Sequence, residues 1–357
     1  MKTNKINFNG QDIFIGIDVH KKSWSIAIVV HGYLTSKFSI DPKPKILKRR
    51  LNELYPNGNY YSVYEAGFSG YWADRELRSL GINNIVVNPA DVPTKSKERR
   101  RKTDRVDAIK LAKQLSVGNL EPIYVPSREE ESLRSLVRLR EQLKKDRTRE
   151  KNRIKSLLNF VGITVPVEDE KEEKHWSKGY IETLKNLDIE YPELKQTLDE
   201  DIIKLENTRS QIARVIKSLR ETVKANQQIR EIIDLLLTIP GVGFITAITF
   251  YSEIIDINRF RRLNELAAYV GLAPAVVSSG EKEKTLGLSK QRNKYLRNLL
   301  IEASWKAIKK DRCLQNSYGK LLNRMSKQKA IIRIARKLLN RIARVWRERQ
   351  PYQTEVC

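Results

Sequence analysis

The chain has 357 residues, and its 40% hydrophobic content provides buried cores for two or three domains, which excludes a disordered tail. Its net charge of +25 is far more than solubility needs, and it indicates a polyanionic partner, either nucleic acid or an anionic membrane surface. Two cysteines and three histidines are too few for a disulfide framework or a zinc site, and the N-terminus lacks the apolar segment of a secretory signal. We therefore expect a reducing, cytoplasmic compartment.

The first 40 residues predict three antiparallel β-strands. Residues 12–18, 23–30 and 33–40 alternate as half-buried strands do, and short connectors join them. Alternating helix-like and strand-like stretches follow, at 44–55, 60–65, 70–80 and 84–88. This order predicts an α/β domain over residues 1–126.

Four acidic residues stand at informative places in this domain. Asp18 ends the first strand, and Glu65 ends the fourth strand-like run. Asp104 and Asp107 fall three residues apart on a helix that is expected to begin at Thr103, so both lie on one helix face. Taken singly, a strand-terminal acid is a turn former, and acids in a first helical turn compensate the helix dipole.

Taken together, the four acids can converge at one edge of a small mixed sheet. Converging carboxylates repel each other unless divalent cations neutralise them, and hard oxygen ligands select Mg²⁺ or Mn²⁺. Two such ions about 4 Å apart suit phosphoryl transfer. Lys102 and Arg105, which flank the helical pair, are then expected to contact nucleic-acid phosphates.

Residues 127–228 form a charged, helix-forming region with almost no glycine. Within 192–223, apolar residues repeat every seven positions, which is typical of a coiled coil. The members of this stripe are Leu198, Leu205, Ile212 and Leu219. The stripe fits an intermolecular dimer and equally an amphipathic helix packed inside its own domain.

The last region, 229–357, is expected to be mostly helical. The sequence IPGVG (239–243) resembles the turn of a helix-hairpin-helix element, in which Gly241 and Gly243 would expose backbone N–H groups to a phosphate, although a plain Pro-Gly turn fits too. Residues 235–251 are uncharged, but Pro240 breaks this stretch near its start, so we do not expect it to span a membrane.

Much of the positive charge lies near the C-terminus. Residues 281–350 contain 21 Lys and Arg against 5 Asp and Glu, a net charge of +16. Residues 320–350 predict a basic amphipathic helix or helix pair, which could lie on a membrane but is better suited to nucleic acid because its cations surround the apolar stripe. The expected phosphate contacts here are Arg336 and Lys337, together with Lys290, Arg292, Lys294 and Arg297 after an N-cap at Ser289.

A serine pair precedes Gly280. Ser278 and Ser279 fall in a segment that is expected to be a flexible loop, and such serines are usually loop residues. No histidine lies nearby in the sequence, so a Ser-His relay is not available, and a reactive serine would need another activating group.

Several motifs in chain order resemble a known family. GIDVHK, YEAGFSGYW, KTDRVDAIKLAKQL, IPGVGFITAITFYSEI and KAIIRIARKLL closely match the DEDD-type insertion-sequence transposases, the IS-one-ten family, which are related to the Piv-type DNA invertases. The match covers nearly the whole chain, and the ordered set is far more specific than any one motif.

The resemblance implies a RuvC-like, RNase-H-type N-terminal domain whose metal-binding tetrad falls on Asp18, Glu65, Asp104 and Asp107. It also implies that Ser279 is a nucleophile that forms a phosphoserine bond to cleaved DNA, although Ser278 is adjacent and chemically identical. The family picture adds a composite site assembled from subunits of a homo-oligomer, a dimer or tetramer, and guidance by an element-encoded bridge RNA.

Three alternative functions remain open at this point. A Piv-type site-specific invertase would use the same residues, and a junction resolvase would hydrolyse DNA with water and would need no serine. A non-catalytic relative would only bind nucleic acid.

Overall fold

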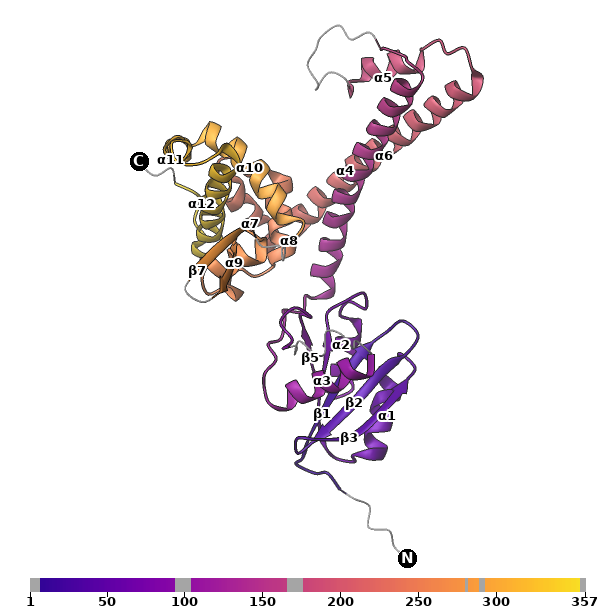
Figure 1. Ribbon diagram of the computed structural model, residues 1–357, viewed down its shortest axis with the longest axis vertical. Helices are drawn as coiled ribbons and strands as arrows, with labels where there is room; N and C mark the ends of the chain where they lie inside the picture. The colour runs from indigo at the N-terminus through magenta and orange to yellow at the C-terminus, as the bar shows by residue number, and fades with distance from the viewer. Residues whose placement is uncertain (1–6, 94–103, 166–175, 280–281, 289–292, 354–357) are drawn as a thin grey trace, which may run out of the picture. The chain divides into compact units, whose positions relative to one another are not determined.

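The computed structural model describes residues 7–93, 104–165, 176–279, 282–288 and 293–353 (Figure 1). For residues 104–105 and 275–286, apart from 280–281, only the backbone is considered. The chain divides into two compact units, Met1–Ser127 and Arg128–Cys357, so the helical region after Ser127 and the C-terminal region fall into one unit.

A five-stranded mixed sheet forms the centre of the first unit. Its spatial order is β3-β2-β1-β4-β5, with β1, β2 and β3 antiparallel and with β4 and β5 parallel to β1. The three antiparallel strands confirm the predicted ones. The strands are β1 (Asp12–Val19), β2 (Trp24–Val30), β3 (Tyr33–Ile40), β4 (Asn59–Glu65) and β5 (Asn83–Val87).

The two faces of this sheet are covered by different helices. Ile13, Ile15 and Ile17 share one face because strand side chains alternate, and they pack with residues of α1 (Pro44–Leu54) and α2 (Trp72–Ser79). On the opposite face lies α3 (Asp104–Ser116), which packs its alanines against β2. The first unit is therefore a mixed α/β domain.

Gly16 lets α3 approach β1 closely. A Cβ atom at this position would lie only 2.0 Å from the carbonyl oxygen of Ala108 and 2.6 Å from the backbone nitrogen of Ala112. Any side chain at position 16 would therefore push α3 away from the sheet. Gly16 and Asp18 lie on the same face of β1, so this contact also sets the distance between α3 and the end of the strand.

A buried polar network ties α2 to the far edge of the sheet. Asp74 is only 2% exposed, and it accepts hydrogen bonds from Arg78 Nε (3.0 and 3.1 Å) and from Asn84 Nδ2 (2.7 Å). The Ser62 hydroxyl donates to Asn84 Oδ1 (2.7 Å). Because these buried polar groups are paired with one another, the network stabilises the packing of α2 against β4 and β5.

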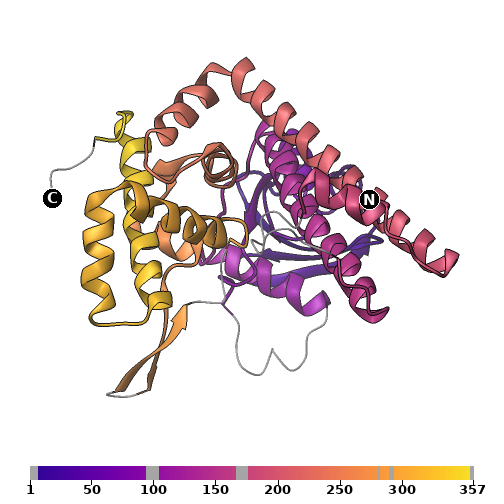
Figure 2. The same cartoon turned by 90° about the horizontal axis from the view of Figure 1, so that it is seen from above.

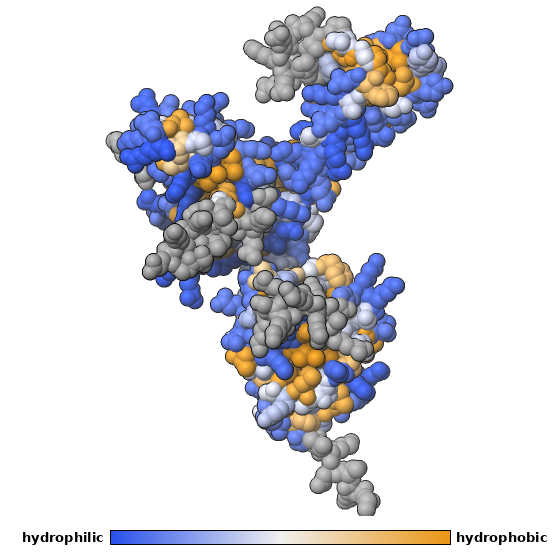
Figure 3. Space-filling view, viewed as in Figure 1, coloured by the Kyte–Doolittle hydropathy of each residue, from blue (hydrophilic) through white to orange (hydrophobic). Residues whose placement is uncertain are grey.

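An antiparallel helix pair begins the second unit. Helix α4 (Arg128–Phe160) packs along α6 (Pro192–Ala225), with α5 (Lys178–Lys185) at the far end (Figure 1). The predicted heptad stripe is buried, and α4 of the same chain covers it at both ends. The structure therefore supports the helix packed within its own domain. Figure 3 shows this pair as mostly hydrophilic, with hydrophobic residues near α5.

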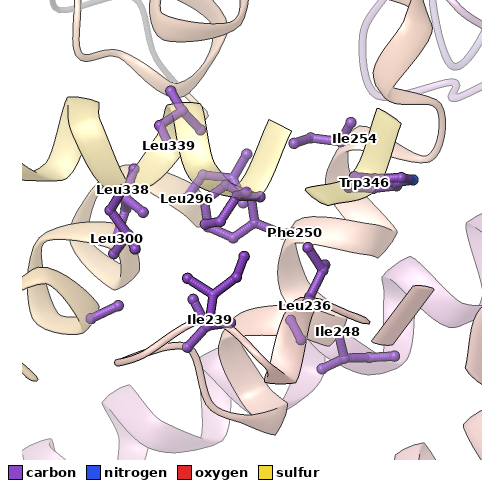
Figure 4. Packing of buried hydrophobic residues seen from close by; sticks show 14 of the residues in the cluster. Leu236, Ile239, Ile248, Phe250, Ile254, Leu296, Leu300, Leu338, Leu339 and Trp346 are labelled. Atoms are coloured by element: carbon purple, nitrogen blue, oxygen red, sulfur yellow. The ribbon is translucent and has the colours of Figure 1, made fainter. Parts of the chain in front are cut away.

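Helices α7 to α12 pack around one large core (Figure 4). They are α7 (Gln227–Leu237), α8 (Phe244–Ile254), the 3-10 turn η3 (Ile257–Arg259), α9 (Leu263–Val270), α10 (Leu296–Lys310), α11 (Arg312–Leu322) and α12 (Lys327–Glu348). The apolar stripe of α12, which includes Leu338 and Trp346, lies inside this core, so it is not available to a membrane. Within the described part of the chain, no helix is long and apolar enough to cross a membrane.

The serine segment forms a β-hairpin and not the expected flexible loop. Strand β6 (Pro274–Ser279) pairs antiparallel with β7 (Lys282–Leu288), and the hairpin extends away from the helices of its unit (Figure 2). After it, α10 begins at Leu296 with Tyr295 as its N-cap. The predicted N-cap at Ser289 lies outside the described residues.

Candidate active site

Two carboxylates lie side by side at the ends of neighbouring strands. Strands β1 and β4 are parallel, and Ile17 pairs with Tyr64, so the next residues along both strands, Asp18 and Glu65, are also neighbours. Paired residues of adjacent strands, about 4.8 Å apart, project from the same face of the sheet. This face is the one that α3 covers.

Asp18 remains accessible and contacts a histidine. Its side chain is 21% exposed, and its Oδ2 lies 3.1 Å from Nε2 of His20. Glu65 is half-buried. Sequence reasoning missed His20 as a site residue, although the spacing of two positions in GIDVH places both side chains on the same side of an extended strand. The histidine can orient the Asp18 carboxylate.

The second acidic pair lies on the helix that covers these strands. Asp107 is half-buried and directly precedes Ala108, which contacts Gly16 on the Asp18 face of β1. Asp104 is the first residue of α3, one helical turn before Ala108, so its position belongs to the sheet-facing stripe. The side chain of Asp104 lies outside the described part of the structure.

The donor set is suited to a hard divalent cation, but the cluster is not closed. Carboxylate oxygens are the ligands that Mg²⁺ and Mn²⁺ prefer. Among the residues whose side chains are described, no three His, Cys, Asp or Glu groups gather closely enough to hold a metal ion. The structure thus brings Asp18 and Glu65 together and places Asp107 on the covering helix, while the fourth acid is not described.

The serine pair lies at the outer end of the β6–β7 hairpin. Ser279 pairs with Lys282 and Ser278 pairs with Glu283, so Ser279 is the position next to the turn. Consecutive positions of a strand belong to opposite faces, and the two serines therefore occupy non-equivalent places on the hairpin. Ser279 belongs to the second unit, whereas the four acids belong to the first.

A basic pocket of about 500 Å³ surrounds the start of α8. Gly243 is the N-cap of α8 and is exposed. Gly241 has a φ of +88°, and a Cβ there would lie 2.7 Å from Ala303 O, so this glycine is needed for close packing against α10. The cations that line the pocket are Arg140, Lys144, Arg220, Lys306 and Lys310.

A second basic groove, of about 750 Å³, runs between α11 and α12. Its described lining contains no acidic residue. The five cations that line it are Lys320, Arg324, Arg333, Arg336 and Lys337. Two of them, Arg336 and Lys337, are among the predicted phosphate contacts. This surface is complementary in charge to a nucleic-acid backbone.

The other predicted phosphate contacts have different surroundings. Lys294 is exposed, as a phosphate contact requires, whereas Arg297 is only 7% exposed and faces the interior of its unit. The burial of Arg297 leaves its predicted phosphate contact without support. Lys102, Lys290 and Arg292 lie outside the described residues, and Arg105 is described only as a backbone position of α3.

Comparison with known proteins gives the same class for both parts of the chain. Residues 15–163 match a family model of DEDD-type transposases, and residues 233–319 match the transposase family IS116/IS110/IS902. The protein is thus a transposase with a DEDD-type N-terminal part. Within that class, the chain belongs to the family of insertion-sequence transposases named after IS110. This family implies an enzyme that cuts and rejoins DNA, with DNA as a partner.

Individual relatives agree with this placement. The transposase for insertion sequence element IS1111A of Coxiella burnetii is 31% identical, over 68% of this chain and 64% of the relative. The transposase for insertion sequence element IS1533 of Leptospira borgpetersenii is 26% identical, over 82% and 84%. The pilin gene-inverting protein of Moraxella bovis is 26% identical, over 96% of this chain and 98% of the relative.

Proposed function

We propose that this transposase cuts and rejoins DNA strands with a metal-binding tetrad in its first unit and a serine nucleophile in its second. The tetrad consists of Asp18, Glu65, Asp104 and Asp107, and the nucleophile is Ser279. The observation that carries the proposal is the parallel register of β1 and β4, which sets Asp18 and Glu65 side by side on the face that α3 covers. An RNase-H-type fold is consistent with this sheet order.

The acids would hold Mg²⁺ or Mn²⁺, and we propose two ions. When bound, divalent cations polarise the phosphate and stabilise the oxygens between which it is transferred. The residues of this chain supply the rest: α3 brings its two acids to the strand pair, and His20 orients the Asp18 carboxylate through the 3.1 Å contact. Gly16 keeps the helix close enough for both pairs to act on one phosphate.

Ser279 would make the covalent intermediate. Its Oγ attacks the phosphorus, the Oγ–P bond forms as one P–O bond to a deoxyribose breaks, and the released sugar oxygen takes up a proton. A sugar hydroxyl of another strand then attacks the phosphoserine, which forms the new phosphodiester and restores the serine hydroxyl. The number of phosphodiester bonds is unchanged, so the reaction needs no external energy source.

The basic surfaces of the second unit would hold the nucleic acids. The groove between α11 and α12 and the pocket at α8 supply cations for phosphate contacts that do not depend on sequence. We propose that the substrates are element ends and target DNA, that a bridge RNA guides the choice of site, and that a homo-oligomer acts in a prokaryotic cytoplasm. A net charge of +25 supports the binding of such long polyanions.

The test is to trap covalent protein–DNA adducts on a nicked substrate that cannot religate. Ser279→Ala should abolish the adduct, and Ser278→Ala is the matched control because it removes the same hydroxyl from the adjacent strand position. An adduct that persists in both variants would show that the nucleophile is another group. Absence of any adduct, with cleavage retained, would favour a resolvase that uses water.

A site-specific DNA invertase is the second candidate. It is favoured by the similarity to the pilin gene-inverting protein, because the alignment covers 96% of this chain and 98% of that relative. Both candidates use the same chemistry, so adduct assays do not separate them. Incubation with a plasmid carrying paired element ends does: a transposase joins the ends to new DNA, whereas an invertase only reverses the segment between them.

A further inference from the structure

A cluster of hydrogen bonds joins the two roots of the serine hairpin. Tyr269 precedes β6 in the chain, and Asn293 follows β7. The backbone N–H of Asn293 donates to the carbonyl of Tyr269 (2.9 Å), so the chain enters and leaves the hairpin at the same point. This hydrogen bond lies at the base of the hairpin, which otherwise extends away from its unit (Figure 2).

The cluster is centred on a buried acid. Glu253, near the end of α8, is only 1% exposed. Asn293 Nδ2 donates to its carboxylate at 2.8 Å, and the Tyr269 hydroxyl donates to its backbone carbonyl at 2.9 Å. Both hairpin roots therefore attach to one residue of a core helix. Neither the acids of the first unit nor the basic surfaces described above include this residue.

The long helix α4 completes the cluster. Arg138 donates two hydrogen bonds to the Glu253 carboxylate, from Nε at 2.7 Å and Nη2 at 2.9 Å. Its guanidinium also lies 4.8 Å from the centre of the Tyr295 ring, just after the second root. The side-chain hydrogen bond to Glu253 raises the pKa of Arg138, so the guanidinium stays charged. Paired, planar ion pairs of this kind fix orientation as well as distance.

We propose that Glu253, Arg138 and Asn293 form a clamp of positioning residues that aims the hairpin, and with it Ser279, at the DNA strand. This inference rests on the proposed role of Ser279. No contact of the clamp with DNA is required, because it acts through the hairpin roots.

Leverage explains why the roots matter. Strand β6 has six residues and spans about 20 Å at about 3.3 Å per residue. A rotation of 10° at the roots would displace the tip by roughly 3.5 Å, and a displacement of about 1 Å already costs roughly 10²-fold in the rate of a reaction that depends on alignment. A loosened root would therefore slow the attack even if the hairpin itself stayed paired.

The experiment compares two asparagines of the same unit. Asn293→Ala removes the bond to Glu253 and the bond that Asn293 Oδ1 accepts from Tyr295 N (2.9 Å). Asn226→Ala is the control, because Asn226 caps α7 by accepting a hydrogen bond from Ile229 N (3.1 Å) and is not part of the cluster at the hairpin roots. We expect single-turnover adduct formation to slow at least tenfold in Asn293→Ala and to change less than twofold in Asn226→Ala, with DNA affinity unchanged in both.

Two further readouts keep the inference falsifiable. Amide hydrogen exchange, measured on the full-length variants, should rise at the hairpin roots in Asn293→Ala and not in Asn226→Ala. Tyr269→Phe, which removes a single hydroxyl, should also slow adduct formation. A wild-type adduct rate in Asn293→Ala would overturn the clamp, as would unchanged exchange at the roots. An adduct that survives Ser279→Ala would instead overturn the proposed nucleophile, so the two failures are distinct.

Discussion

Two pairs of acids in this protein have opposite surroundings. Asp74 and Glu253 are 2% and 1% exposed, and each is held by an arginine and an asparagine. The Asp18 side chain is 21% exposed at the end of a strand, beside Glu65 and His20. Acids of the first pair hold elements together, whereas acids of the second pair remain reachable by a cation and a phosphate.

The largest effect should come from removing charge at the strand ends. Asp18→Asn keeps the size of the side chain, so we expect little loss of stability but a fall of at least about 10²-fold in Mg²⁺-dependent cleavage, since even the outer partners of metal ligands carry effects of 10–100-fold. Cleavage assays at saturating DNA, with thermal melting in parallel, measure both. A variant Asp18→Asn with a lowered melting temperature and a wild-type cleavage rate would show that Asp18 has a structural role and not a catalytic one.

Asp74→Ala should show the reverse pattern. It leaves the amide of buried Asn84 without its 2.7 Å partner, which we expect to lower the free energy of unfolding by about 2 kcal/mol. Urea unfolding of wild type and variant gives this difference, and cleavage per folded molecule should stay within about twofold. A change in the free energy of unfolding below about 0.5 kcal/mol would show that Asp74 does not stabilise the fold.

The smallest effect concerns a third buried acid, Asp311, at the start of α11. Burial alone raises its pKa, but hydrogen bonds from Leu314 N–H and the Tyr352 hydroxyl, with the charge of Arg341, outweigh burial and hold the pKa below the ordinary value. A lowered pKa stabilises the fold above the unfolded-state value of about 4, and this contribution is lost as the pH falls through the folded-state pKa.

In Asp311→Asn, the melting temperature should therefore fall less steeply as the pH is lowered than it does in the wild type. Melting temperatures between pH 7 and pH 3 provide the measurement, with wild type losing more stability over this range than the variant. Equal slopes would mean that the carboxyl of Asp311 titrates alike in the folded and unfolded states.

Much of the first unit could be predicted from sequence because its signals are local. The alternation in residues 12–40 has the period of a strand, and the His31-Gly32 connector adopts positive φ at both positions, as a tight hairpin turn requires. The position of Asp18 at a strand end follows from the same alternation, and that of Glu65 follows from the strand-like run 60–65. The close approach of α3 at Gly16 could not be predicted in this way, since it depends on packing between Gly16 and Ala108, which are far apart in the sequence.

The second unit was harder to predict for related reasons. The heptad stripe in α6 is visible in the sequence, but a stripe does not identify its partner, which is α4 of the same chain. The β6–β7 hairpin was missed because β7 is rich in charged residues and its strand pattern is weak. The Glu253 clamp joins α4, α8 and the segment before α10, so no local pattern could reveal it.

The central claim, that the strand-end acids bind a divalent cation, is tested most directly by Mn²⁺ binding to the full-length protein, followed by electron paramagnetic resonance of the free ion. The account predicts that wild type binds Mn²⁺, that Glu65→Gln weakens binding at least about tenfold, as loss of a direct ligand should, and that Asp74→Asn binds as wild type does. Equal Mn²⁺ affinity in wild type and Glu65→Gln would contradict it.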